Sequence, residues 1–492
     1  VVLAPDLPGS LRTNPWLDAW IRVGPDGITV YTGKVELGTG VKTALLQIAA
    51  ERLEVAPTAI NLLTADTALT PNEGYTAGSH SIFDSGTALY NAAAQVREML
   101  VDAAARSWQV DAAQLSTRDG IIQGPSGQRM AYAEAVKHVD VHQYAKAQSP
   151  VMAAADFKLI GHNLPRLDIP AKVSGGAAFV QDMRLPGMLH ARVIRPPRPG
   201  CTLQAFDAAS IEALNGVVKV IRDGNYLAVV AGDEWQAIKA MRAGMESAKW
   251  SGGEAIPEAA GIHDLLKQLP SKRYPISNNG NPGGVTETRF KARVTKQYLM
   301  HGSIGPSCAV AWFNDGVLTV WTHTQGVYPL RAGIAEMLRL PPERVRCIHT
   351  EGSGCYGHNG ADDAAADAAL IAMRLPGTPV RVQWMREQEN LWEPYSSAMV
   401  TEVDAGLSHG RLQDWNYELW TTPHNERIVN AGRLLPARLL AKPFASAPSV
   451  PIAQPEGDGD RNAVPLYELG ATRINMNFVT TMPFRTSAMR SL

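Results

Sequence analysis

One loop constrains the fold of this chain more than any other feature, because it carries glycines at Gly352, Gly354 and Gly357. Residues 345–349 before the loop predict a strand, and the Ala-rich residues 361–374 after it predict a helix. Strand, G-x-G-x-x-G loop and helix in this order form the context of a dinucleotide-binding fingerprint, in which a phosphate approaches backbone N–H groups at the start of the helix. The chain is therefore expected to mix strands and helices.

The residues around this loop argue against a nicotinamide dinucleotide. Asp362 and Asp363 stand at the start of the helix, where their carboxylates repel a phosphate. The strand at 380–385 should end in an acidic residue that binds a ribose, but it offers only Glu387, beyond Arg386. An NAD(P)-dependent oxidoreductase that uses residues 352–357 stays as one alternative, and a plain tight turn as another.

Composition excludes several classes of protein. The chain has 492 residues, with 46 Lys and Arg against 47 Asp and Glu, and a formal net charge of −1. These values are typical of a soluble globular protein and exclude a disordered chain or the basic stripe of a nucleic-acid-binding protein. No apolar run is long enough to span a membrane.

Cysteine and histidine spacings give no sign of a metal site. The chain has four cysteines without a C-x-x-C pair, which excludes a zinc ribbon or an iron–sulfur site: Cys201, Cys308, Cys347 and Cys355. Histidines at 80, 301, 323, 349 and 358 lack metal-ligand spacing and are expected to be polar surface residues. The chain starts at Val1 rather than Met, so we expect that its true start has been lost by processing.

Three further segments place small or polar residues where a ligand could bind. Residues 33–40 carry three glycines before a predicted helix, and the run Gly78-Ser79-His80-Ser81 precedes a long one. Gln325 follows a predicted strand at 317–321 and can donate a hydrogen bond without adding charge. Taken singly, each segment is equally compatible with an ordinary turn, helix cap or strand end.

Taken together and in order, these segments resemble a known family, the molybdopterin-binding large subunits of molybdenum hydroxylases such as xanthine dehydrogenase and aldehyde oxidoreductase. Residues 33–40 (GKVELGTG) are similar to its G-Q-x-E-x-G-Q-G loop, and residues 64–88 look like its Ser-bearing pterin loop. Thr324-Gln325 and the later Gly354-Cys355-Tyr356-Gly357 resemble its S-T-Q and G-G-F-G pair. Residues 485–492 (RTSAMRSL) look like the start of its Arg-Gly-Phe-Gly segment.

The order of the segments points to one branch of that family. Residues 172–189 resemble its hammerhead domain, and the 33–40 loop precedes them here, whereas common members carry that loop late. This permuted order resembles isoquinoline oxidoreductase, nicotinate dehydrogenase and membrane-associated aldehyde dehydrogenases. The resemblance implies an α+β fold with a permuted molybdopterin-binding segment at 1–160, an inserted α/β hammerhead domain at 161–260, and the first part of a molybdopterin-binding domain at 261–492.

The chain departs from the family pattern at several positions. Lys34 and Thr39 stand where the family usually has Gln, and Cys355 and Tyr356 replace Gly and Phe. The family's catalytic Glu belongs to a G-x-G-E segment that these residues do not contain. We therefore expect an N-terminal portion of a longer protein, with a C-terminal fragment or a second chain supplying the base.

The resemblance also implies a cofactor and its binding residues. The cofactor would be molybdenum held by molybdopterin cytosine dinucleotide, without a protein ligand to the metal. Gln325 would donate to the apical oxo ligand, and Arg490 would face the substrate. The residues implied in cofactor binding are Gly38, Thr39, Gly40, Gly78, Ser79, His80, Ser81, Gly326, Gly354, Cys355, Tyr356 and Gly357.

The implied activity is that of the catalytic subunit of a multi-subunit dehydrogenase, which oxidises aldehydes to carboxylic acids or hydroxylates N-heterocycles with water-derived oxygen. Electrons would leave through [2Fe-2S] clusters on a small subunit, with haem c on a cytochrome c subunit as a further carrier. An export signal is frequent in this branch, which implies a periplasmic protein that associates with the membrane through a partner subunit. A non-catalytic scaffold of the same fold remains as an alternative.

Overall fold

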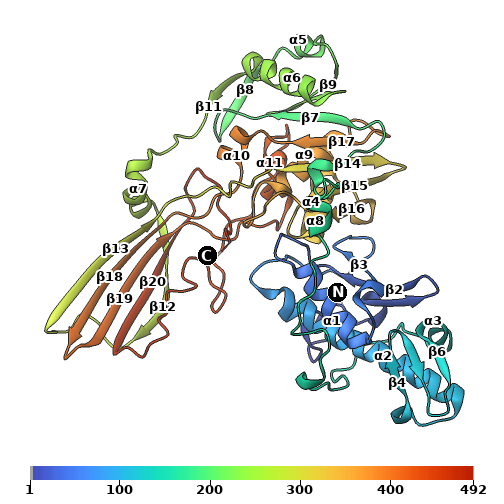
Figure 1. Cartoon of the computed structure of the whole chain (residues 1–492). Coiled ribbons are helices and arrows are strands. Elements are labelled where there is room, and N and C mark those ends of the chain that lie inside the picture. The colour runs from blue at the N-terminus through green and yellow to red at the C-terminus, as the bar shows by residue number, and fades with distance from the viewer. Residues whose placement is uncertain (1–3, 491–492) are drawn as a thin grey trace. The chain divides into compact units, whose positions relative to one another are not determined.

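The computed structural model describes residues 4–490, which form two compact units. Unit 1 comprises the residues up to 184 together with 316–335 and 341–352. Unit 2 comprises 185–315, 336–340 and the residues from 353 onward. Each unit is therefore assembled from segments far apart in the sequence, and Figure 1 labels their helices and strands.

The core of unit 1 is a small sheet covered by two helices. Its strands are β1 (Ile21–Gly24), β2 (Gly27–Thr32) and β3 (Ile60–Thr64), in that order. The Asp-Gly turn between β1 and β2 predicts a hairpin, and the antiparallel pairing of the two strands confirms it, whereas β3 joins β2 in parallel. Helices α1 (Val41–Leu53) and α2 (Thr87–Trp108) bury their apolar residues in the same core.

The rest of unit 1 includes a minor sheet and a parallel strand pair. The minor sheet is β4 (Ser116–Arg118), β5 (Ile121–Gln123) and β6 (Arg129–Ala131), followed by α3 (Tyr132–Ala135) and, further on, α4 (Ile169–Val173). β15 (Val317–Thr322) and β16 (Val345–His349) pair in parallel, and α8 (Val327–Leu338) lies between them in the chain. The loop after β3 attaches to β16, because Asp66 bridges to Ile348 and accepts a hydrogen bond of 3.0 Å from Arg346 Nε.

Unit 2 begins with strands that pair in the order β14, β17, β7, β10, β9. β17 runs parallel to β7, and the pairing of β10 with β7 and with β9 is antiparallel. The bounds are β7 (Leu189–Ile194), β9 (Val217–Asp223), β10 (Tyr226–Ala231), β14 (Cys308–Asn314) and β17 (Val380–Gln383). The pair β8 (Cys201–Ala205) and β11 (Lys249–Gly252) accompanies them, with helices α5 (Ala208–Glu212) and α6 (Glu234–Ser247).

Helix α9 (Ala361–Ala372) is buried along its whole length, including Asp362, Asp363 and Asp367. Its many Ala side chains are small enough to let neighbouring elements approach closely, and it packs on β14 and β17. The short helices α10 (Arg386–Trp392) and α11 (Leu435–Leu439) belong to the same unit. Among the helices that the structure describes, none is long and apolar enough to cross a lipid bilayer.

A second sheet of unit 2 corrects one prediction. Its order is β12 (Ser271–Asn279), β20 (Ala471–Val479), β19 (Arg411–Thr421), β18 (Met399–Ser408) and β13 (Thr288–Lys296), with α7 (Ile262–Gln268) nearby in sequence (Figure 1). Proline and glycine signals at 275–284 predict a loop, but residues 275–279 belong to β12. β12 is an edge strand with an irregular register after Pro275, and an edge strand tolerates a residue without an N–H group.

Candidate functional site

The predicted site residues fall into two groups, one in each unit. Unit 1 holds Gly38–Gly40, Gly78–Ser81, Gln325 and Gly326. Unit 2 holds residues 354–357 and Arg490. The structure joins distant segments inside each group, and the groups are described in turn.

In the glycine loop of unit 1 (residues 33–40), Glu36 accepts hydrogen bonds from Thr39 and Gly40, two residues that the resemblance assigns to cofactor binding. Glu36 is 2% exposed, and its carboxylate accepts from Gly40 N–H at 2.9 Å, Lys42 N–H at 3.0 Å and the Thr39 hydroxyl at 3.4 Å. A buried carboxylate needs such donors. In this structure the Gly40 N–H and the Thr39 hydroxyl serve Glu36, and cofactor binding by these two residues stays a prediction. Gly38 differs, because its φ is +90° and nothing lies within 4 Å of the place where a side chain would stand.

An ionic network that sequence patterns did not reveal packs against this loop. Arg166 Nη1 donates to the Gly38 carbonyl at 3.0 Å, and the same guanidinium pairs with Asp168. Lys172 pairs with both Asp168 and Glu351. The guanidinium of Arg166, together with Lys172, holds the pKa of Asp168 well below its usual value, whereas burial raises the pKa of Glu351. Arg166, Asp168 and Lys172 are near neighbours in the chain, but their contacts with the Gly38 carbonyl and with Glu351 join distant segments, which no local pattern predicts.

Removing the central carboxylate of this network should destabilise unit 1. Because the pKa of Asp168 is lowered in the folded protein, its ion pairs stabilise the fold at neutral pH and are lost as the pH falls below about 4. We expect Asp168→Asn to lower the free energy of unfolding by roughly 1–3 kcal/mol at pH 7, and by less at pH 3. Thermal unfolding at both pH values measures this, with Asp26→Asn as control because the Asp26 side chain is 90% exposed. Equal effects of both variants would contradict a stabilising role for the network.

In the Gly78–Ser81 loop, Gly78 and Ser79 are exposed, and the loop leads into a wide turn before α2. Gly78 and Ser79 have φ values of +65° and +62°, which allow the chain to turn sharply before residues Ser81–Gly86 form a π-helical turn. His80 Nδ1 lies 3.5 Å from Asp84 Oδ2. A π-turn at a helix start is frequent at functional sites.

Gln325 and Gly326 lie against residues 75–76 of the predicted pterin loop. The Gln325 carbonyl accepts from Thr76 N–H at 2.8 Å, and Gln325 Nε2 donates to the Thr76 carbonyl at 3.1 Å. Gln325 is 9% exposed. A side chain at Gly326 would stand 2.5 Å from Tyr75 Cδ1, so only glycine allows this approach. Backbone and side chain of Gln325 are therefore both fixed by the same residue of the pterin loop.

Two side chains, the buried Lys34 and the half-buried His349, hold these segments together. Lys34, at a position where the family usually has Gln, is 2% exposed and donates to the Glu73 carbonyl at 3.0 Å and the Tyr75 carbonyl at 3.2 Å. His349 Nδ1 lies 3.0 Å from the Thr324 carbonyl, and Nε2 lies 3.1 Å from the Glu36 carbonyl. Burial lowers the pKa of His349 to about 4, so the ring is neutral and donates to only one of these carbonyls.

The expectation that the histidines lie on the surface is wrong for several of them. His301, His323 and His358 are each less than a tenth exposed. Their burial follows from packing against distant segments, which the residue type alone does not predict. Within residues 4–490, no group of three or more His, Cys, Asp or Glu side chains could hold a metal ion.

In unit 2 the glycine loop pairs with the segment that carries Arg490. Gly357 bridges to Met489, and Arg490 N–H donates to the Tyr356 carbonyl at 2.6 Å. A side chain at Gly357, whose φ is +129°, would stand 2.2 Å from the Ala488 carbonyl. Cys355 is buried, its Sγ lies 3.2 Å from the Gly357 carbonyl, and burial raises the pKa of its thiol. Arg490 itself is exposed.

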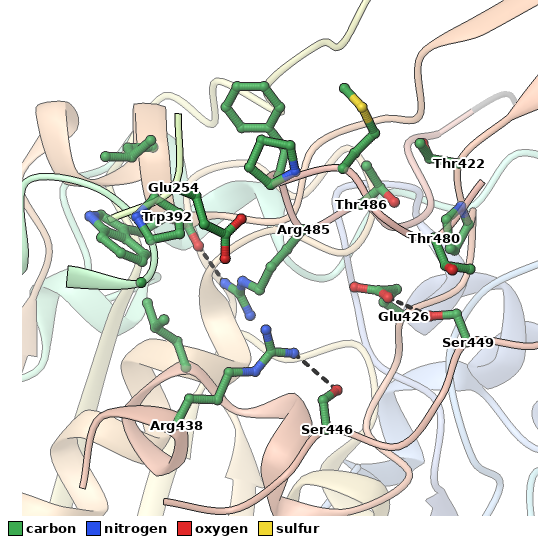
Figure 2. Close-up of a pocket in the computed structure, with 18 of the residues that line it drawn as sticks. Glu254, Trp392, Thr422, Glu426, Arg438, Ser446, Ser449, Thr480, Arg485 and Thr486 are labelled. Carbon is green, nitrogen blue, oxygen red and sulfur yellow. Dashed lines mark hydrogen bonds between the residues drawn. The ribbon is translucent and has the colours of Figure 1, made fainter. Parts of the chain in front are cut away.

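A cavity of about 590 Å³ lies within unit 2, beside residues 485–486 (Figure 2). Arg485 Nη2 donates to Asp363 at 2.6 Å, and Arg438 Nη2 donates to Ser446 at 3.1 Å. Burial and the nearby Arg485 lower the pKa of Arg438 to about 10. None of the predicted site residues lines this cavity. The arginines that line the cavity donate hydrogen bonds to neighbouring groups, and we assign no function to this cavity.

Comparisons with known proteins agree with the resemblance. Models of a molybdopterin cofactor-binding domain match residues 5–175 and 280–422. The chain is 35% identical to a nicotinate dehydrogenase subunit of Pseudomonas putida, over 97% of its own length and 40% of the relative's. It is 27% identical to the beta subunit of isoquinoline 1-oxidoreductase of Brevundimonas diminuta, over 79% of this chain and 57% of the relative.

Two more matches extend this result. The membrane-bound aldehyde dehydrogenase (pyrroloquinoline-quinone) of Gluconacetobacter polyoxogenes is 26% identical, over 99% of this chain and 64% of the relative. Quinoline 2-oxidoreductase from Pseudomonas putida 86 shares the fold, with a TM-score of 0.52 and 15% identity over 67% of this chain and 45% of that one. The chain spans less than two thirds of the length of these relatives.

The predicted α+β fold is confirmed by this structural likeness. The family assignment rests on the matched domains and on similarity along nearly the whole chain. The chain belongs to the molybdopterin-binding proteins of the molybdenum hydroxylase family, in the branch that contains these relatives from nicotinate dehydrogenase and isoquinoline 1-oxidoreductase.

Proposed function

We propose that this chain forms part of the molybdenum-binding catalytic subunit of a multi-subunit dehydrogenase that hydroxylates N-heterocycles or oxidises aldehydes to carboxylic acids with water-derived oxygen. One structural observation carries the proposal. The segments that the resemblance assigns to one cofactor are distant in sequence, yet they pair inside each unit: Gln325 with Thr76, and Arg490 with Tyr356. Gly326 and Gly357 allow these close approaches, which bring together, within each unit, the segments assigned to the cofactor.

The residues of unit 1 fit a pterin at the open side of the glycine loop. The backbone at Gly38 is accessible, since nothing lies within 4 Å of the place where a side chain would stand. Ser79 is exposed just before the helical turn Ser81–Gly86 that leads into α2, where N–H groups and hydroxyls favour an anion. Thus we assign binding to Gly38 and to the 78–81 loop, rather than to Gly40 and Thr39, whose donors serve Glu36.

The roles proposed for the remaining residues follow from their positions. The bound molybdenum centre would supply the two-electron oxidation and the oxygen transfer. Gln325 is held by Thr76 with its neutral amide in a buried environment, where a preorganised donor acts without reorganisation. Arg490 presents an exposed guanidinium next to the 354–357 loop and would stabilise negative charge that develops on a substrate. The backbone of 354–357 would line the site.

Cofactor form, partners and location complete the proposal. We assign the cytosine dinucleotide form of molybdopterin, a general base contributed by a Glu of a further segment or chain, and electron transfer to a [2Fe-2S] subunit and a cytochrome c subunit. Two of the relatives are themselves named as subunits, which supports the existence of partner subunits. A periplasmic location belongs to the same proposal and follows from the branch resemblance.

Elemental analysis of the intact complex is the direct test. We expect about one Mo for each copy of this chain, and co-purifying subunits identified by mass spectrometry. Turnover with nicotinate, isoquinoline and aldehydes in ¹⁸O-water, followed with an artificial electron acceptor, would then identify the substrate class. A folded complex without Mo would contradict the proposal, and binding of NAD(P) to it would favour the dinucleotide alternative.

A further inference from the structure

A chain of hydrogen bonds connects three buried side chains of unit 2. His358 Nδ1 lies 2.8 Å from Ser487 Oγ, and His358 Nε2 lies 2.9 Å from Asp362 Oδ2. Ser487 is 1% exposed, His358 7% and Asp362 4%. Asp362 belongs to the first turn of α9, whose other residues are also buried, so the acidic end of the chain is held by a rigid element.

The partners determine the form of the imidazole. A carboxylate accepts hydrogen bonds only, so Nε2 carries the proton and donates to Asp362, and Nδ1 accepts from the Ser487 hydroxyl. Burial lowers the pKa of His358 and keeps this neutral tautomer, although Asp362 opposes that effect, and Arg427 and Asp363 are the other charged groups that act on the ring. The order Ser, His, Asp resembles a nucleophilic triad, but a hydroxyl that is 1% exposed is not accessible to a substrate.

The same three residues join the two loops that the proposed function uses. His358 N–H donates to the Ala488 carbonyl at 2.8 Å, and Arg490 N–H donates to the Tyr356 carbonyl at 2.6 Å. Ser487 N–H donates to the Tyr395 carbonyl at 2.7 Å, which fixes the other side of the segment. His301 Nε2 lies 3.2 Å from the Ala488 carbonyl. Residues 485–490 are therefore held in place by short backbone contacts, with the Ser487–His358–Asp362 chain between them and α9.

We propose that His358 is a positioning residue, which uses the Ser487–His358–Asp362 chain to lock the segment that carries Arg490 onto the 354–357 loop. The inference rests on the proposed function only for its catalytic consequence, since the locking itself is a property of unit 2. The Ser487–His358 bond adds to the two backbone bonds that join residues 485–490 to residues 356–358, and residues 485–490 have no strand or helix of their own. Without the side-chain bonds, Arg490 would keep its charged guanidinium but would be held less firmly next to the 354–357 loop.

Hydrogen exchange in the Ser487→Ala variant tests the locking directly. The variant removes one hydroxyl and leaves the backbone, His358 and Arg490 unchanged. We expect the amides of His358 and Arg490 to exchange about 2- to 10-fold faster, because a hydrogen bond that closes the structure locally has been lost. Ser397→Ala is the matched control: Ser397 is also 1% exposed and donates to the Pro423 carbonyl at 2.7 Å. Equal exchange at His358 and Arg490 in both variants would overturn the proposal.

A second variant tests the role of the imidazole. Glutamine at 358 keeps a donor near Nε2 for Asp362 and lacks the acceptor at Nδ1. We expect His358→Gln to accelerate exchange as Ser487→Ala does, and the double variant to be no faster than either single one, because both remove the same bond. Additive effects would mean that the two side chains act separately, which would overturn the chain as a unit. If His358→Gln does not fold, the Ser487→Ala result decides alone.

Activity of the complete complex then separates this inference from the proposed function. In Ser487→Ala we expect an unchanged Mo content with kcat reduced several-fold, while Ser397→Ala retains both. Faster exchange with unaltered kcat would show that the lock serves the fold only and would overturn its role in placing Arg490. Absence of Mo in the wild-type complex would contradict the proposed function. The hydrogen-exchange result would still test the locking of residues 485–490, because it does not depend on Mo.

Discussion

Gly357→Val should disrupt the pairing between the 354–358 loop and residues 485–490 and should block loading of molybdenum into the complex. A side chain at Gly357 would meet the Ala488 carbonyl at 2.2 Å and Met489 Cα at 2.8 Å, and the φ of +129° is strained for any residue with a Cβ. Backbone strain of about 1–3 kcal/mol and overpacking of about 1–3 kcal/mol add to a loss of roughly 4 kcal/mol in the free energy of unfolding. Mo content and thermal unfolding of the purified complex measure the two effects.

A matched glycine separates strain from collision. Gly377 has a φ of +80° with nothing within 4 Å of a side-chain position, so Gly377→Ala introduces strain alone. Gly357→Ala introduces both strain and collision with the smallest side chain. We expect Gly377→Ala to retain full Mo content and Gly357→Ala to lose most of it. Full Mo occupancy in Gly357→Val would refute the placement of this loop at the cofactor.

Gln325→Ala should lower kcat by about 100-fold while the protein stays folded and keeps its molybdenum. The loss is the size seen when one preorganised donor to a reacting oxygen is removed. The bond from Nε2 to the Thr76 carbonyl also disappears, which costs about 1 kcal/mol of stability, whereas the backbone bond from Thr76 N–H to the Gln325 carbonyl remains. Steady-state kinetics, Mo analysis and thermal unfolding are measured on one preparation.

Gln95→Ala supplies the control for this experiment. Gln95 is 2% exposed in the same unit; its Nε2 donates to the Lys146 carbonyl and to Ser149 Oγ at 2.9 Å each, and its Oε1 accepts from Lys146 N–H at 2.8 Å. Its removal should therefore cost at least as much stability as that of Gln325. It has no proposed role at the site. If Gln95→Ala loses at least as much stability as Gln325→Ala and only Gln325→Ala loses turnover, Gln325 acts on the reaction. An unchanged kcat in Gln325→Ala would remove this residue from the site.

Local patterns predicted the elements that depend on near neighbours in the chain. The Asp-Gly turn predicted the β1–β2 hairpin, and the apolar spacing along α1 and α2 predicted helices that the structure confirms. Glycine positions predicted the loops at 38–40 and 354–357, where φ values between +80° and +129° require residues without a Cβ, apart from Tyr356 at +57°. Pro275 misled, because the rule that proline breaks strands does not hold at the edge of a sheet.

The hydrogen-bond partners of most buried polar side chains come from segments that are far away in the sequence. Glu36 accepts from the loop that it belongs to, and this could be suspected from its spacing to Gly40. In contrast, Lys34 meets the Glu73 and Tyr75 carbonyls, and His349 meets the carbonyls of Glu36 and Thr324, across distances in sequence that no periodicity encodes. Burial of charged or polar groups requires such partners, and only the assembled fold brings them together.

By itself, then, the sequence determined the fold class, the positions of the glycine loops and the membership of a molybdopterin-binding family, because backbone conformation and apolar periodicity are written locally. The tertiary structure alone decided that the Gly40 N–H and the Thr39 hydroxyl serve Glu36. It also decided that Ser487, His358 and Asp362 form one chain behind Arg490. The physical reason is that a hydrogen bond depends on the distance between two atoms in space, and the fold sets that distance.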